Sequence, residues 1–234
     1  MSSKTSIETF FYIGHEKLSL YVFDGTNKKI FVKEILINNF DKKKNFNNSI
    51  DEFLRDNIIK IEKKINKFVN DINLIISDTN FVLIQASIKK NGKGDKIYKK
   101  DLNYMLFDLK QQIKENNMDK TITYMRINNF IVDNKKYLSI NDNFECSELS
   151  LHVDFTCLSN EIIDNFSQKI KKYQIRIDKI FSAEYLKENF ENYSGNECQI
   201  AAKLKYENDE NEVHLISKTI EKRGFFESFF KFFN

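Results

Sequence analysis

Side chains that could perform nucleophilic, acid–base or metal chemistry are few in this sequence, and their spacing fits no catalytic or metal site. The three cysteines are widely separated and form no CxxC pair, and the three histidines occur in no HExxH arrangement. These residues are Cys146, Cys157, Cys198, His15, His152 and His214. No paired catalytic carboxylates and no nucleophile with an adjacent base stand out either. We therefore expect no enzyme activity, no metal, no cofactor and no disulfide framework, and a reducing cytoplasm follows as the compartment.

A glycine pair beside a lysine could in principle hold a phosphate. The segment 91–95 reads Asn-Gly-Lys-Gly-Asp, but it lacks both the further glycine of a dinucleotide fingerprint and the GK[ST] of a P-loop. This composition is typical of a surface hairpin loop.

Phenylalanine is concentrated at the C-terminus, where six of the 22 residues of this type fall within the last ten positions. Placed on a helix, all six lie within less than half of the circumference, and the other side carries Glu227, Ser228, Lys231 and Asn234. Such a wedge fits a bilayer interface, with its cationic neighbours at anionic lipid. The predicted membrane-binding residues are Phe225, Phe226, Phe229, Phe230, Phe232, Phe233, Lys222, Arg223 and Lys231.

An amphipathic terminal helix can instead dock on the core of its own chain. Three features favour the membrane here: the apolar side is purely aromatic, an acidic segment (207–212) separates it from the preceding helix, and it lies at the end of the chain. Self-docking stays open as the alternative.

The composition of the whole chain is that of a folded protein of one to two domains. It has 234 residues, 30% charged and 41% hydrophobic, with a net charge of +3. This small net charge implies no nucleic-acid partner. No apolar run reaches 18 residues and no signal peptide is recognisable at the start, so neither a spanning helix nor export is expected.

Hydrophobic periodicity predicts a mixture of strands and helices in which the two do not alternate strictly, which is the α+β class. The predicted strands are 9–13, 17–23, 29–37, 72–76, 81–88, 121–127, 129–132, 135–140, 148–158 and 175–181. The predicted helices are 49–68, with Ser49 and Glu52 as a capping box, and 100–116, 159–173, 182–190 and 198–206.

The order of these segments resembles the bacterial actin-like cell-division family FtsA. The first hairpin of that family is similar to FYIGHEKLSLYVFDG, its inserted 1C subdomain to KKDLNYMLFDLKQQI and ELSLHVDFTCLSNEIIDNFSQKIKKYQIRIDKIF, and its membrane-targeting helix to RGFFESFFKFFN. The last helix of its 1A subdomain resembles CQIAAKLKY. Each match is short, and the shared order covers nearly the whole chain.

The resemblance implies a partial actin-like (ribonuclease H-like) 1A subdomain with an inserted FtsA-type 1C subdomain, and subdomains 2A and 2B absent. The implied divisions are 1–80 (1A remnant), 81–181 (1C), 182–206 (returning 1A helices), 207–221 (linker) and 222–234 (membrane helix). The first phosphate turn of the family is degenerate here at Ile13 and Gly14, without its aspartate or hydroxyl, and the second is missing. The resemblance therefore assigns no nucleotide-binding residue to this chain. It assigns no FtsZ-binding surface either, because that surface lies in 2B.

The resemblance therefore implies a non-enzymatic adaptor that lies peripherally on the cytoplasmic face of the cell membrane at the division site. It would present a protein-interaction domain to divisome proteins and could self-associate. Two alternatives stay open: a soluble interaction module with a self-docked C-terminal helix, and a degenerate actin-like nucleotide-binding protein.

Overall fold

The computed structural model describes residues 7–37, 43–77, 80–92, 94, 96–140, 143–190 and 195–207. Their elements follow in the order β1 (Glu8–Ile13), β2 (Lys17–Phe23), β3 (Lys29–Leu36), α1 (Lys43–Ile65), β4 (Asp71–Ile76), β5 (Val82–Asn91), β6 (Lys96–Tyr98), α2 (Lys99–Asn116), β7 (Lys120–Val132), β8 (Lys135–Tyr137), β9 (Asn143–Glu145), β10 (Glu148–Ser159), α3 (Asn160–Lys171), β11 (Arg176–Ser182), α4 (Ala183–Asn189) and α5 (Glu197–Glu207). The predicted α+β class is confirmed.

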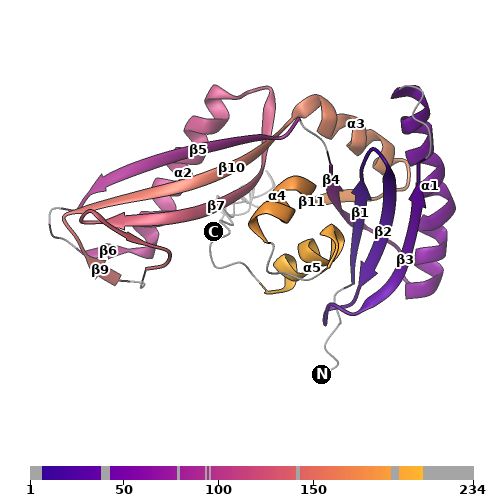
Figure 1. Ribbon diagram of the computed structural model, residues 1–234, viewed down its shortest axis with the longest axis horizontal. Helices are drawn as coiled ribbons and strands as arrows, with labels where there is room; N and C mark the ends of the chain where they lie inside the picture. Colours follow the sequence, from indigo (N-terminus) through magenta and orange to yellow (C-terminus); the bar gives the residue numbers. More distant parts are fainter. Residues whose placement is uncertain are drawn as a thin grey trace, which may run out of the picture.

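A five-stranded sheet in the order β11-β4-β1-β2-β3 forms one end of the molecule (Figure 1). The strands β1, β4 and β11 are parallel, whereas β2 and β3 extend the sheet as antiparallel hairpins. Phe10 and Phe11 are both completely buried, although successive side chains point to opposite faces of a strand. Phe11 stacks on Phe53 of α1, and Phe10 belongs to the cluster that packs with α4 and α5. Helices thus cover both faces of this sheet, which explains the continuous apolar run of β1.

The second sheet has the order β5-β10-β7-β8 and carries α2 on one face (Figure 1). Along β10, Leu149, Leu151, Val153 and Phe155 alternate with polar residues and are fully buried in the core shared with α2. This period-2 pattern fixes which face of β10 meets the helix. The opposite face carries polar side chains. The short strands β6 and β9 pair as a separate ladder, and Ile97 of β6 packs in the core shared with α2.

The capping box predicted at Ser49 and Glu52 is wrong, because α1 begins at Lys43, six residues earlier. Phe46 packs against the same core as the later apolar residues of α1, so the amphipathic pattern extends back by one turn. The helix ends at Ile65 rather than at Phe68. Asn66 adopts a left-handed conformation (φ 52°), which terminates the helix and leaves Phe68 in a loop.

The two strands predicted at 121–127 and 129–132 are one strand, β7. The apparent break is a β-bulge: His152 pairs with Asn129 and Val153 pairs with Ile127, so Asn128 has no opposite residue. Strand β8 ends at Tyr137, shorter than the predicted 135–140. The sequence prediction missed β6 and β9, since three residues carry no recognisable alternation.

Candidate functional site

The turn at Gly14 lies at the edge where three parallel strands end, which we call the carboxyl edge. Strand β1 ends at Ile13, β4 at Ile76 and β11 at Ser182, and the three end residues lie side by side. The backbone N–H of Ser77 donates to the Ile13 carbonyl at 2.9 Å. In open α/β sheets, ligands characteristically bind at such an edge, so it is the first place to look for a site.

The ring of Tyr12 occupies the space above the Gly14 turn. A Cβ atom on Gly14 would lie 2.7 Å from Tyr12 Cε1 and 2.8 Å from its hydroxyl oxygen, so the close approach of this ring is what requires glycine here. Tyr12 is only 8% exposed, and the Lys17 ammonium lies 4.9 Å from the ring centroid. Burial raises the pKa of the Tyr12 phenol, which therefore stays neutral.

Two hydroxyl groups that could donate to a ligand at this edge are bound to Glu184 instead. The Ser77 hydroxyl donates to Glu184 Oε1 at 2.6 Å, and the Ser182 hydroxyl donates to Oε2 at 3.3 Å. Ser182 is also the N-cap of α4, since its Oγ accepts the Tyr185 N–H. Glu184 lies in the first turn of that helix, where the helix dipole stabilises a negative charge.

A salt bridge between Lys187 of α4 and Glu197 of α5 lies beside these groups, with a distance of 2.9 Å. Burial acts to raise the pKa of Glu197, but the hydrogen bond from Lys187 and the neighbouring charges outweigh it and the pKa is lowered. The hydrogen bond to Glu197 raises the pKa of Lys187. Both groups are charged near neutral pH, and Lys187 is already paired with Glu197.

The carboxyl edge is therefore poorly suited to a phosphate. An anion there would meet two carboxylates, Glu184 and Glu197, and the edge of a neutral ring, and close like charges repel. Among the described residues, no three His, Cys, Asp or Glu side chains gather so as to hold a metal ion.

The structure describes some of the residues singled out in the sequence and not others. Ile13 is buried in the core and Gly14 forms the turn described above, whereas all nine predicted membrane-binding residues lie outside the described part of the chain. The three cysteines are buried and unpaired by disulfides, and burial raises the pKa of Cys157 to about 11. In the part of the chain that is described, no helix combines the length and apolar character needed to cross a bilayer.

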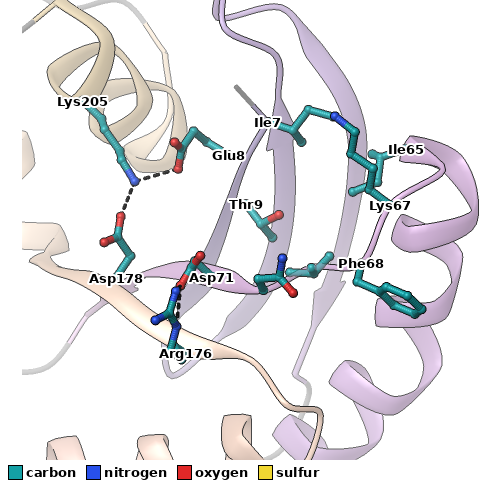
Figure 2. Close-up of a pocket in the computed structure, with 12 residues that line it drawn as sticks. Ile7, Glu8, Thr9, Ile65, Lys67, Phe68, Asp71, Arg176, Asp178 and Lys205 are labelled. Carbon is teal, nitrogen blue, oxygen red and sulfur yellow. Dashed lines mark hydrogen bonds and ion pairs between the residues drawn. The ribbon is translucent and has the colours of Figure 1, made fainter. Parts of the chain in front are cut away.

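A cleft of about 500 Å³ lies at the opposite edge of the same sheet, the amino edge, where β1, β4 and β11 begin (Figure 2). Lys205 of α5 donates to Glu8 Oε2 at 2.6 Å and also binds the carboxylate of Asp178. Arg176 binds Asp71 through two nitrogens, at 3.0 and 2.8 Å. In these ion pairs two cations face three carboxylates, and Lys205 joins α5 to the first residues of β1 and β11.

Comparison with known proteins gives structural similarity only. No family model and no curated protein matches the chain. A solved structure described as the PilM-PilN type IV pilus biogenesis complex matches 76% of this chain and 48% of its own, with 9% identity and a TM-score of 0.48. The cytoplasmic domain of EpsL, an inner membrane component of the type II secretion system of Vibrio cholerae, matches 77% of this chain and 57% of its own, with 11% identity and a TM-score of 0.34.

A third structure, from Bacteroides thetaiotaomicron, is described as having an actin-like ATPase fold and unknown function. It matches 79% of this chain and 55% of its own, with 9% identity and a TM-score of 0.33. The chain thus spans about half the length of each of these structures. None of the three descriptions mentions cell division, so the FtsA resemblance and its subdomain divisions stay predictions from the sequence.

Proposed function

We propose that this protein is a non-enzymatic adaptor that binds the cytoplasmic face of the cell membrane. The observation that carries the non-enzymatic part is the filled carboxyl edge. Tyr12 covers the Gly14 turn, and Glu184 holds the two hydroxyl groups that a phosphate would need. A nucleotide bound here would have to displace a buried ring and approach two carboxylates.

The membrane part of the proposal rests on the aromatic wedge predicted from the sequence of residues 222–234. Six phenylalanines on one side of a short helix bury apolar surface in the headgroup–acyl boundary, while the adjacent cations meet anionic lipid. Together with the FtsA resemblance, this wedge leads us to propose that the protein acts at the division site as an adaptor for divisome proteins.

The second sheet is the surface that would meet protein partners. Its one face is covered by α2, and the other presents polar side chains such as Gln85 and Asp154, which hydrogen-bond to each other at 3.2 Å. Strand β5 lies at the edge of this sheet, with ten residues pairing on one side with β10. Such an edge can accept a strand from a partner or from a second copy.

The membrane contact is tested by two matched variants of the full chain. Phe229→Glu places a charge on the aromatic side of the predicted helix, and Ser228→Glu places the same charge on its polar side. Losing one buried phenylalanine removes about 1.5–3 kcal/mol, which is about tenfold or more in the partition constant. We expect Phe229→Glu to abolish most co-sedimentation with phosphatidylglycerol-containing vesicles and Ser228→Glu to retain it. Equal binding by both variants would reject an aromatic wedge.

Calorimetry with ATP and magnesium tests the non-enzymatic part. We expect no saturable heat, and a saturable binding curve would revive the nucleotide-binding alternative. A fluorescent fusion that is distributed evenly along the membrane, without enrichment at the septum, would remove the division-site assignment while leaving the membrane contact in place.

A further inference from the structure

The amino edge gathers the ends of several elements at the place where the described chain stops. Helix α1 ends there, and β1, β4 and β11 begin there. Lys205 in the last turn of α5 binds Glu8 at the start of β1, so the end of α5 lies at this edge as well. Residue 207, the last that the structure describes at this end of the chain, therefore lies at the amino edge.

Phe68 is an exposed aromatic residue at this edge. It lies in the loop between α1 and β4 and is 81% exposed, the most exposed of the large apolar side chains in the described residues. Figure 2 shows its ring on the α1 side of the cleft, opposite Lys205. The neighbouring Ile59 is 58% exposed, and the two line a shallow hollow of about 340 Å³ together with Val69 and Tyr173. Val69 and Tyr173 pack in the core beneath this hollow, whereas Phe68 and Ile59 belong to none of the core clusters.

Three lysines precede Phe68 within five positions of the sequence. Lys63, Lys64 and Lys67 are exposed, and none of them forms an ion pair within the described part of the chain. The acidic groups at this edge are already engaged. Asp71 binds Arg176, while Glu8 and Asp178 bind Lys205, and the Glu62 carboxylate accepts the Val69 N–H at 3.1 Å.

We propose that the amino edge is a second membrane contact, in which Phe68 enters the bilayer interface and the three lysines meet anionic headgroups. The inference rests on the proposed function, because the wedge would bring this edge to the membrane. The positive charge of the three lysines favours anionic lipid over the C-terminal wedge as the partner of this surface. A cationic, aromatic surface complements anionic lipid, whereas docking of the wedge would bring Lys222, Arg223 and Lys231 against the same lysines. Two linked contacts would bind more tightly than either and fix the orientation of the adaptor.

The sequence contains no tryptophan, so a single introduced tryptophan reports on its own position. We compare Phe68→Trp with Met118→Trp in the full chain, since Met118 is 79% exposed and lies in the loop between α2 and β7. With phosphatidylglycerol vesicles, we expect a blue shift and quenching by bilayer-embedded quenchers for Phe68→Trp and neither for Met118→Trp. Co-sedimentation of the Phe68→Trp chain without any spectral change would overturn this inference alone. If the full chain does not sediment at all, the proposed function fails and this inference fails with it.

Measurements in buffer identify other occupants of the patch. A blue shift of Phe68→Trp that vanishes when the chain ends at Glu221 would mean that the wedge covers the patch, and one that grows with protein concentration would mean a second copy. Either result overturns the membrane assignment.

The lysines are tested by a triple change to glutamine at 63, 64 and 67, with Lys114, Lys135 and Lys136 changed together as a control of equal net charge. We expect the first set to lower the partition constant at least tenfold and the control to leave it nearly unchanged. Equal losses for the two sets would show that only net charge matters, which would contradict a specific surface.

Discussion

Replacing Gly14 by alanine tests whether the Tyr12 ring, rather than a ligand, determines the structure of the carboxyl edge. The added Cβ would lie 2.7 Å from Tyr12 Cε1, well inside the normal carbon–carbon separation of about 3.5–4.0 Å. The ring would have to move by roughly the difference, about 1 Å. Tyr12 is nearly buried and is held by Lys17 over its face, so this displacement disturbs packed neighbours.

Overpacking of this kind typically costs about 1–3 kcal/mol, and we expect the free energy of unfolding of Gly14→Ala to fall by about 2 kcal/mol. Urea denaturation monitored by circular dichroism measures it, with an unchanged m-value showing that the native state stays compact. In a chain of this size, the melting temperature should fall by about 4–8 °C.

The control is a double-mutant cycle with Tyr12→Leu, which removes the ring atoms that the new Cβ would meet. We expect Gly14→Ala to cost nearly nothing in that background, so the coupling energy should be close to the whole 2 kcal/mol effect. If Gly14→Ala destabilises both backgrounds equally, contact with Tyr12 is not the reason for glycine at this position.

Two further predictions concern ion pairs. The pKa of Glu197 is lowered in the folded state, so the contribution of this carboxylate to the free energy of unfolding is full above its unfolded pKa of about 4.3 and is lost as the pH falls through the lower folded value. The difference in the free energy of unfolding between wild type and Glu197→Gln should therefore shrink on acidification. A difference that stays constant from pH 6 to 3 would refute this. Lys205→Met leaves Glu8 and Asp178 without their shared cation, and since these side chains are only partly buried we expect the free energy of unfolding to fall by about 2 kcal/mol. The exposed Lys114 of α2 serves as the control, and we expect almost no loss for Lys114→Met; equal melting temperatures for the two variants would contradict the prediction.

The elements of the fold that could be predicted are those whose periodicity is strong over many residues. The alternation from Leu149 to Cys157 predicted β10 and its buried face, because each side of the strand has one environment. The boundaries of α1 could not be predicted, since Ser49 satisfies a capping pattern that the packing of Phe46 overrides. Similarly, Asn128 reads as a break between strands, but a bulge accommodates it within one.

Less of the candidate site could be predicted from the sequence. Gly14 was recognised as a turn, but its neighbours Ser77 and Glu184 are 107 positions apart and meet only because β4 and β11 end side by side. The exposure of Phe68 was also not predicted, because the predicted helix 49–68 includes this residue as its last. The left-handed conformation of Asn66, which ends that helix, depends on the path into β4 and is not visible in the hydrophobic pattern.

The most direct test of the account compares co-sedimentation of the full chain with that of a chain ending at Glu221, using vesicles that contain phosphatidylglycerol. We predict that the full chain sediments with the vesicles and that the shortened chain, which keeps the whole described part, loses at least nine-tenths of the binding, since a single remaining contact of Phe68 and its lysines is weak. Equal sedimentation of the two chains would contradict a membrane adaptor anchored by its aromatic wedge.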